Sequence, residues 1–585
     1  MKFTNFSIPV LREAMSSAMS RFPLALISAF SCGLISIYLI ELKDKAPEMQ
    51  RIFFSLAIGL PWLTGLHLLL ESYVKPLSQK LLLYFIGIAF LILIFIFIAP
   101  DFDEDYLERP VRFFAFFLIS HLLVALAPFL KSGNLKEFWE YNKDAFVIWF
   151  VGIFYALIIY LGLSIALVAI DNLFDIRIQW KLYAEILIII AAGFHQVFVL
   201  SNFPKAGQAG IHNISYTKTI RNLCFYILIP LTILYFLILY AYGIKIVSSG
   251  ELPKGWVSSL VLGFSGIGMI SYLLNYLLPH LEDSKLSSLF KKYFFYILTP
   301  LVILLFVSIN RRLSDYGFTP PRYFVLITGI WLFISCIYYL FSKSNNIKLI
   351  PLSLILFLLF GTISPFDAFH TSTSSQYKRL VSLLEKNKAL ENGKIKSSMV
   401  ALGIPEKESI KEIIYTLDKM GALKSINTLL KEPIPFDTIV YHDPRDFLYE
   451  KMGLTISLEN KNSQKAIYLS TSDRNDYTVS GFERIFIFNL YKGGIDENIN
   501  LEDIQGTSII ICKKLQDTIP LNDLLIKINE KYDKSGSNSI LDTPFDMDTK
   551  LFKYRLFIKN LNYQKYESKL TIDYMQAVLL SGRKN

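Results

Sequence analysis

Charged residues are scarce in this 585-residue sequence, because Asp, Glu, Lys and Arg make up only 18% of it, against roughly 25% in soluble domains. Cysteine is also rare. Three of the four cysteines (Cys32, Cys224 and Cys336) lie in apolar runs, and Cys512 stands alone. This spacing supports neither a disulfide framework nor a metal-ligand cluster. A P-loop, a dinucleotide-binding fingerprint, an HExxH motif and a nucleophile elbow are all absent from the sequence. The enzyme classes that these motifs mark are therefore not indicated, and we predict no cofactor.

Apolar residues are what the sequence has in excess. Hydrophobic residues account for 53% of the chain and its mean hydropathy is +0.42, which is too high for a soluble protein of this size. The excess lies before about Phe366, and charges are denser after it. This division predicts a membrane part followed by a water-soluble part. The net charge of +10 fits basic membrane loops. No basic run or binding motif points to nucleic acid, so the lipid bilayer is the expected partner.

The apolar part contains eleven runs long enough to cross a bilayer as helices, which requires about 20 residues. Continuous apolar runs predict helices and not the alternating strands of a membrane barrel. The final run is short and follows a tight turn, which leaves ten spans as the alternative. The runs are Phe22–Ile40, Ile52–Leu70, Leu81–Ala99, Phe113–Leu130, Ala145–Ile170, Leu182–Leu200, Leu223–Tyr242, Trp256–Leu278, Tyr293–Ile309, Tyr323–Phe341 and Ile347–Ile363.

Lys and Arg in short loops indicate the orientation, because they accumulate on the cytoplasmic side. The N-terminal segment and the even-numbered loops hold 16 of these residues, and the odd-numbered loops hold 12. This bias favours a cytoplasmic N-terminus. Eleven spans then place the C-terminal domain outside the cytoplasm, whereas ten would place it inside.

The C-terminal part has the pattern of a soluble α+β domain. One helix is predicted around Leu380 to Leu384, and a second around Ile410 to Leu417 that ends at Gly421. Alternating or short apolar runs predict strands, and Leu521–Tyr532 is predicted as a helix after Pro520. The strand-like runs are 454–458, 484–488, 508–512, 552–558 and 570–580. We therefore divide the chain into a cytoplasmic segment (1–21), a transmembrane helical bundle (22–365) and a soluble α+β domain (366–585).

Five polar residues inside the apolar runs or at the end of one are candidates for a functional site, because ionisable groups are costly in hydrocarbon. His67 and Glu71 are four residues apart and share a helix face, where they could relay a proton, bind a cation or simply be solvated at the interface. His121 lies near the middle of its span. It could be a proton or ligand site, or a neutral ring bonded to a backbone carbonyl or Ser120. His195 and Gln196 could form part of a site or could pack one helix against another.

The three histidines could also act together. If their helix faces meet, three imidazoles on three helices could hold a metal ion or relay protons. Nothing in the sequence shows that the faces meet, so no metal ligand is assigned.

Two segments resemble the bacterial domain-of-unknown-function family 4153. The resemblance implies a multi-spanning inner-membrane protein over most of the chain. That family has no assigned activity, so no catalytic or binding residue is carried over. The matching residues are Phe138-Trp139, Tyr141-Asn142-Lys143, Gly162-Leu163, Asp171-Asn172-Leu173-Phe174 and Phe203-Pro204, followed by Ser375-Gln376, Arg379-Leu380, Leu383-Leu384, Lys386-Asn387 and Gly393-Lys394.

These observations support two main hypotheses for function. The first is a transport-related membrane protein, in which His and Glu residues within the bundle are coupling or substrate groups. The second is a cell-envelope scaffold or signalling protein, whose C-terminal domain binds a protein partner. A membrane enzyme is a third possibility, which the sequence favours least because it lacks a cluster of carboxylates at one interface.

Overall fold

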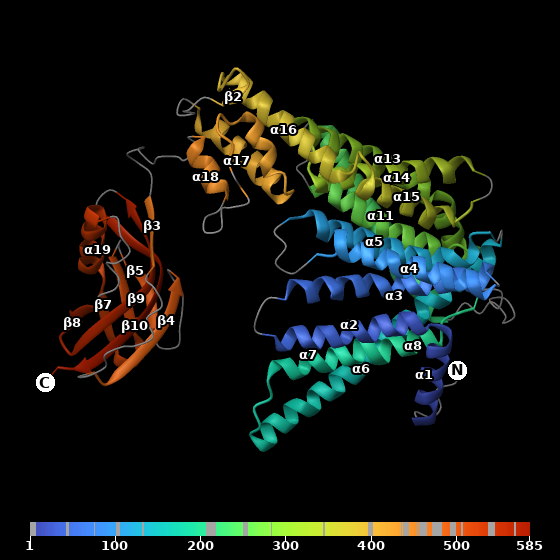
Figure 1. Ribbon diagram of the computed structural model, residues 1–585, viewed down its shortest axis with the longest axis horizontal. Helices are drawn as coiled ribbons and strands as arrows, with labels where there is room; N and C mark the ends of the chain where they lie inside the picture. The colour runs from blue at the N-terminus through green and yellow to red at the C-terminus, as the bar shows by residue number, and fades with distance from the viewer. Residues whose placement is uncertain are drawn as a thin grey trace. The chain divides into compact units, whose positions relative to one another are not determined.

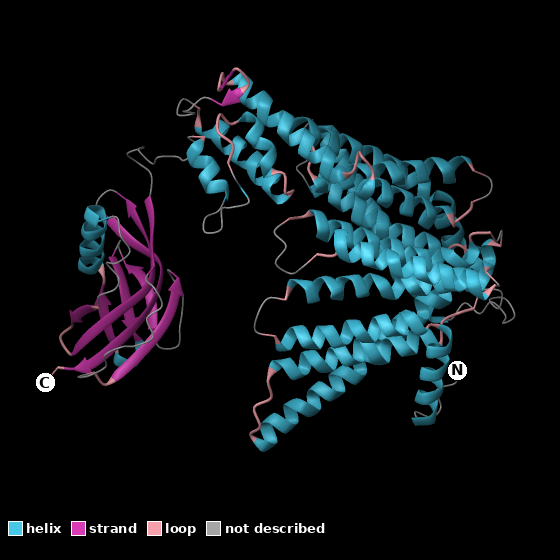
Figure 2. Ribbon diagram, in the orientation of Figure 1, coloured by secondary structure: helices cyan, strands magenta, loops and turns pink. Residues whose placement is uncertain are grey.

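The structure is a computed structural model that describes residues 8–584, except for 43–45, 75, 101–105, 132–133, 206–217, 250–255, 282–283, 343–344, 396–401, 435, 437–443, 453, 455–464, 471–481, 492–498, 505–506, 536–543 and 567–568. It forms two compact units, which divide between Leu454 and Thr455. The first unit is helical and the second contains most of the β-structure (Figure 2).

The first unit consists of long helices with short connections (Figure 1). Each of the eleven apolar runs lies on a helix or on consecutive helical segments, as predicted. The helical segments up to α15 are α1 Ile8–Arg21, α2 Pro23–Glu41, α3 Pro47–Tyr73, α4 Leu77–Phe97, α5 Glu108–Leu126 with η1 Ala127–Phe129, α6 Leu135–Phe174, α7 Trp180–Ile189, η2 Ile190–His195, α8 Gln196–Ser201, α9 Lys218–Asn222, η3 Leu223–Leu228, α10 Ile229–Ser249, α11 Trp256–Leu274, α12 Leu278–Leu281, α13 Lys285–Tyr316, α14 Pro320–Phe341 and α15 Leu349–Ile363.

Within the described ranges, ten helices or helical runs are long and apolar enough to cross a membrane, and α15 makes eleven if its bent pair with α16 counts as one span. The bend between α15 and α16 is 47°. Large apolar side chains cover the outer surface. On α6, for example, Phe154 is 59% exposed and Ile165 is 69% exposed. Such a surface is stable in lipid and not in water, so the chain is a multi-pass membrane protein.

Small residues allow the first helices to approach closely. A Cβ atom at Gly59 of α3 would lie 2.6 Å from Ser28 Oγ of α2, and one at Gly33 of α2 would lie 2.7 Å from the Cβ of Ala192 in η2. Lipid offers no hydrophobic force between helices, so close backbone packing of this kind holds them together. The α1 helix lies crosswise to α2 (Figure 1).

Hydrogen bonds and ion pairs identify the two ends of the bundle. Tyr73, at the end of α3, donates a hydrogen bond of 2.8 Å from Oη to the Pro128 carbonyl just beyond α5. At the start of α5, Arg112 Nη2 lies 3.0 Å from Asp367 Oδ2, just after α15. The residues around Tyr73 and those around Asp367 are therefore at opposite ends of α5.

Three helices that follow α15 also belong to the first unit. They are α16 Ala368–Lys386, α17 Ile404–Lys419 and α18 Pro444–Lys451, together with the short strands β1 Leu390–Glu391 and β2 Lys394–Ile395 and the turn η4 Leu423–Leu429. Buried Leu380 and Leu384 of α16 share one apolar core with Tyr323 of α14. The boundary drawn at 366 from hydropathy thus differs from the boundary of the compact units, because an amphipathic helix can pack on the bundle without being apolar overall.

The predicted helix elements in this part are confirmed. The α16 and α17 helices contain the two predicted apolar stripes, and Gly421 follows α17 with a φ of +67°. Ala422 N donates a hydrogen bond of 2.8 Å to the Leu417 carbonyl across that turn. A residue without a Cβ adopts such a left-handed conformation without strain.

The second unit is built mainly from antiparallel strands. One sheet has the order β3-β9-β10-β4 with β8 paired to β9, and a second has the order β5-β6-β7. The helix α19 also belongs to this unit, and Leu525 on this helix is buried in the same core as Ile510 and Leu579. The predicted run 454–458 lies almost wholly outside the described residues, and the other predicted strands are confirmed. The bounds are β3 Lys465–Ser470, β4 Arg484–Tyr491, β5 Ile499–Ile504, β6 Thr507–Cys512, η6 Lys513–Leu515, β7 Asp517–Pro520, α19 Asn522–Ser535, β8 Phe545–Asp548, β9 Phe552–Tyr566 and β10 Lys569–Arg583.

Candidate functional site

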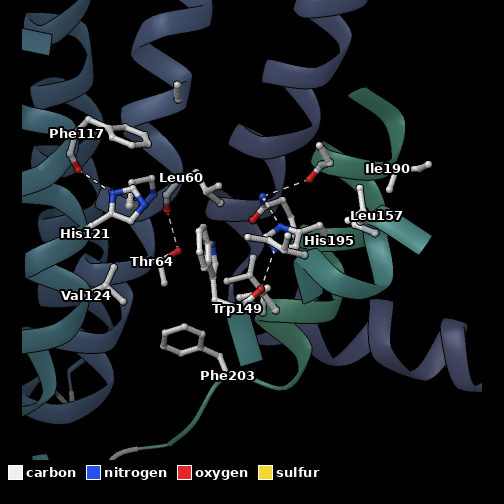
Figure 3. A pocket seen from close by; sticks show the side chains of 18 of the residues that line it. Leu60, Thr64, Phe117, His121, Val124, Trp149, Leu157, Ile190, His195 and Phe203 are labelled. Carbon is white, nitrogen blue, oxygen red and sulfur yellow. Dashed lines mark hydrogen bonds between the residues drawn. The ribbon is translucent and has the colours of Figure 1, made fainter. Parts of the chain in front are cut away.

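A cavity of about 490 Å³ lies among α3, α5, α6 and the segment from α7 to α8. We call it the histidine cavity, because His121 and His195 are on its wall (Figure 3). Its lining also includes Trp149 and Leu157, which are 44% and 50% exposed, so it opens on the lipid-facing surface. Most lining side chains are apolar. The polar ones are Thr64, His121, Trp149, Tyr160, His195 and Gln196.

Two of the helices that line this cavity have irregular backbones. The segment Ile190–His195 is a π-helical turn, and such turns in α-helices are frequent at functional sites. Pro61 lies inside α3 and has no N–H to donate to the carbonyl of Ala57, four residues earlier. Ala57 and Pro61 both line the cavity. The local backbone thus differs from a regular helix on two sides of the same space.

His195 is buried, with 7% of its surface exposed. Its Nδ1 lies 3.1 Å from Gln196 Nε2, and its Nε2 lies 3.4 Å from the Trp149 carbonyl. Gln196 Nε2 also donates to the Ala191 carbonyl at 3.3 Å. An amide nitrogen only donates, so His195 Nδ1 accepts and the ring is neutral with its proton on Nε2. His195 and Gln196 therefore tie α6 to the π-helical turn.

His121 lies on the other side of the cavity (Figure 3). Its Nδ1 donates a hydrogen bond of 2.8 Å to the Phe117 carbonyl, one turn earlier in α5. Ser120 does not provide this bond, because its hydroxyl donates to the Phe116 carbonyl at 2.7 Å. The ring is exposed, and its second nitrogen can meet a molecule in the cavity.

A second cavity, of about 610 Å³, lies at the end of the bundle that contains Tyr73. We call it the polar pocket. His67 and Glu71 both line it, as expected from their spacing on one helix face. His67 Nδ1 is hydrogen-bonded to the Tyr84 hydroxyl of α4. The remaining lining residues are Ser17, Ser20, Arg21, Leu70, Lys80, Ser201, Asn202, Phe203, Pro204 and Lys205.

Arg21 connects three parts of this pocket. Its Nη2 lies 2.9 Å from Glu71 Oε2 and donates to the Pro204 carbonyl at 3.0 Å, while Nη1 donates to the Phe203 carbonyl. Sequence reasoning did not select Arg21. Its position at the start of a span, with Glu71 near the end of the next, is the signal that could have paired them.

The three histidines do not line one cavity. His121 and His195 line the histidine cavity, and His67 lines the polar pocket. In the described part of the chain, no group of three or more His, Cys, Asp or Glu residues could hold a metal ion. The idea of a shared metal or proton site on three helices therefore finds no support in this geometry.

A third polar group, which sequence reasoning also missed, lies at the opposite end of the bundle. Asp367 is buried, and its Oδ1 accepts hydrogen bonds from the backbone N–H of Phe369 and His370 and from His370 Nδ1. Its Oδ2 lies 3.0 Å from Arg112 Nη2. An Asp directly before a helix is a common N-cap, which is the signal that could have identified it. This group anchors α16 to α5.

A bundle of transmembrane helices followed by a β-rich region defines the class of this molecule, a polytopic membrane protein with a C-terminal domain. The model of the family described as Domain of unknown function (DUF4153) matches residues 23–383, which is more than half of the chain, and the chain belongs to this family. The resemblance found in the sequence is thus confirmed. The chain is similar to an uncharacterized protein of Pasteurella multocida (strain Pm70), with 24% identity over 493 residues that cover 81% of this chain and 83% of the relative. No solved structure matches the chain.

Proposed function

We propose that this chain is a transport-related protein of the bacterial inner membrane, and that the histidine cavity takes up a largely apolar molecule from the bilayer. The single observation that carries the proposal is the cavity itself. It has the size and the mostly apolar lining of a small-molecule site, with a few polar groups that can orient a ligand. It lies within the transmembrane segments and opens toward lipid.

The positions of the polar groups support binding of one hydrogen-bonding group. His121 offers its second ring nitrogen from α5, and Gln196 offers an amide oxygen from α8, on opposite walls of the cavity. The π-helical turn and Pro61 lie beside this space. Breaks of this kind interrupt the regular hydrogen-bond pattern of a helix and are frequent at functional sites.

The orientation that we propose places the N-terminal segment and the polar pocket at the cytoplasmic face. The excess of Lys and Arg on that side supports it. Asp367 lies at the opposite end of the bundle, so the residues that follow α15 would be extracytoplasmic. A reporter fused after Asn585 tests this. Activity of a periplasmic reporter supports the orientation, and activity of a cytoplasmic reporter contradicts it.

Transfer of a probe lipid between leaflets tests the transport proposal. The full-length protein is reconstituted in vesicles that contain a fluorescent phospholipid, and dithionite then destroys only the label in the outer leaflet. We expect protein-containing vesicles to lose inner-leaflet label as well. The variant Leu157→Trp, which fills the cavity opening, should slow this loss. Ile165→Trp, on the exposed surface of α6, is the matched control and should behave as wild type. Equal rates with and without protein would contradict the proposal.

A second candidate is a scaffold or signalling role, in which the β-rich unit binds a protein partner. It is favoured by the separate core of the unit Thr455–Asn585. Crosslinking in native membranes, with the whole chain and with a chain that ends at Leu454, tests it. A specific partner that is lost on truncation supports this role. An unchanged crosslinking pattern contradicts it.

A further inference from the structure

The histidine cavity and the polar pocket adjoin one another. Phe203 lines both of them. On α3, Thr64 belongs to the histidine cavity, while His67, one turn further along, belongs to the polar pocket. On α8, Leu200 lines the histidine cavity and the next residue, Ser201, lines the polar pocket. An apolar space within the spans thus continues into a polar space at their ends.

Cationic side chains outnumber carboxylates in the polar pocket. Arg21, Lys80 and Lys205 line it together with one carboxylate, that of Glu71. A guanidinium has five N–H groups, and the contacts of Arg21 to Glu71, Phe203 and Pro204 use four of them. Arg21 is therefore held in place and largely neutralises Glu71. The charges of Lys80 and Lys205 remain in excess.

Neutral hydrogen-bonding groups accompany these cations. Ser17 and Ser20 come from α1 and Ser201 comes from α8, while His67 and Tyr84 form a pair on the wall. Ammonium groups and hydroxyls that converge on one space are suited to a phosphate group. The pocket lies at the helix ends, which is the depth at which lipid headgroups lie in a bilayer.

We infer that the two cavities form one site for a single anionic phospholipid, with its phosphate in the polar pocket and acyl chain in the histidine cavity. This inference rests on the proposed function, and it adds the class of ligand. A free inorganic anion would meet the same cations, but it would leave the adjoining apolar cavity without an occupant. A zwitterionic lipid would fill the apolar cavity, but it would bring its own positive charge to Lys80 and Lys205. An anionic phospholipid has both a negative charge for the polar pocket and an acyl chain for the histidine cavity.

Competition between two lipids tests this site. The full-length protein is placed in nanodiscs that contain equal amounts of phosphatidylglycerol and phosphatidylcholine, and the retained lipids are counted by native mass spectrometry. We expect wild type to retain phosphatidylglycerol in about tenfold preference, because the two lysines attract the headgroup of an anionic lipid and not that of a zwitterionic lipid. The double variant Lys80→Gln/Lys205→Gln should retain the two lipids about equally.

Two control variants locate the effect. Lys136→Gln/Lys285→Gln removes two exposed cations from the same end of the bundle but outside the pocket, and it should keep the wild-type preference. Leu157→Trp should reduce retention of both lipids. Wild type without a preference, or a preference that survives in the Lys80/Lys205 variant, would overturn the inference. So would excess inorganic phosphate that removes the preference, because the pocket would then be a site for a free anion.

The two proposals can fail separately. Headgroup preference without transfer between leaflets would contradict the transport proposal and support the anionic-lipid site. Transfer that is unaffected by loss of both lysines, in a protein without lipid preference, would contradict the anionic-lipid site and support transport of an apolar molecule.

Discussion

Arg21 and Glu71 are separated by 50 residues in the chain, yet the Arg21 guanidinium lies against the Glu71 carboxylate, with Nη2 2.9 Å from Oε2. The same guanidinium reaches the carbonyls of Phe203 and Pro204. One side chain therefore joins the end of α1, the end of α3 and the segment after α8. These three segments form much of the polar pocket.

Removal of this guanidinium should destabilise the protein. Arg21→Ala leaves Glu71 and two backbone carbonyls without their donor, and we expect a loss of about 1–3 kcal/mol. Arg21→Lys should recover only part of this loss, because an ammonium group cannot reproduce the fork of a guanidinium. Thermal unfolding in detergent measures both, with Arg12→Ala on the exposed surface of α1 as a control. Full recovery of stability in Arg21→Lys would show that only the positive charge is needed at this position.

The carboxylate of Asp367 should contribute more to the stability of the protein than an ordinary surface charge does. Asp367→Ala removes the buried partner of Arg112, which keeps only its ion pair with Glu108, and it also removes the N-cap of α16. We expect a loss of about 1–3 kcal/mol. Asp367→Asn keeps an oxygen that can cap the helix, so its loss should be smaller. The control is Asp315→Ala, which breaks an exposed i,i+4 pair with Arg311 and should change stability by less than about 0.5 kcal/mol. Equal losses in Asp367→Ala and Asp315→Ala, measured by thermal unfolding, would contradict this role.

The sequence predicted the spans and the shared helix face of His67 and Glu71, because both depend on local spacing. A run of apolar residues identifies a helix in lipid, and a separation of four identifies a shared face. Arg21 and Asp367 were missed because their partners come from other helices, and helix crossings cannot be read from periodicity. The π-helical turn was missed for a different reason. Its residues Ile190–His195 are compatible with an ordinary helix, and only the packing of α2 and α6 around them distinguishes it.

Close packing around His195 should make Gly152 intolerant of substitution. A Cβ atom at Gly152 would lie 3.0 Å from Cδ2 of His195 and 3.0 Å from Cδ1 of Phe198. Gly152→Val adds two further carbons, and overpacking of this kind costs about 1–3 kcal/mol. Gly162, on the same helix, has nothing within 4 Å of its Cβ position, so Gly162→Val is the matched control. Thermal unfolding should show that Gly152→Val is less stable than Gly162→Val. Similar stabilities of the two variants would mean that α6 moves freely over α8.

The pH dependence of the β-rich unit should include a contribution from Asp546. Its carboxylate accepts hydrogen bonds from Arg555 Nε at 2.6 Å and Nη2 at 2.9 Å, and these bonds lower the pKa of Asp546 below its usual value. The stabilisation is therefore fully present above the usual Asp pKa of about 3.9, and it is lost as the pH falls through the lower pKa of the folded state. Because the side chain is 63% exposed, the effect should be small.

Thermal unfolding of wild type and of Asp546→Asn measures this contribution across that pH range. We expect wild type to be more stable at neutral pH and the difference to vanish in acid. A difference that grows in acid would contradict the assigned direction. The ion pair between Lys584 and Asp548 serves as a comparison for the Asp546–Arg555 pair, because it also joins exposed side chains, with Nζ 3.1 Å from Oδ2.

The most direct test of the whole account is an electron cryomicroscopy map of the full-length protein in nanodiscs that contain phosphatidylglycerol. We predict a chain of density between His121 and His195 that passes Phe203 and ends in a stronger feature beside Lys80 and Lys205. A map with well-resolved side chains around the histidine cavity, and with no lipid density in it, would contradict the account.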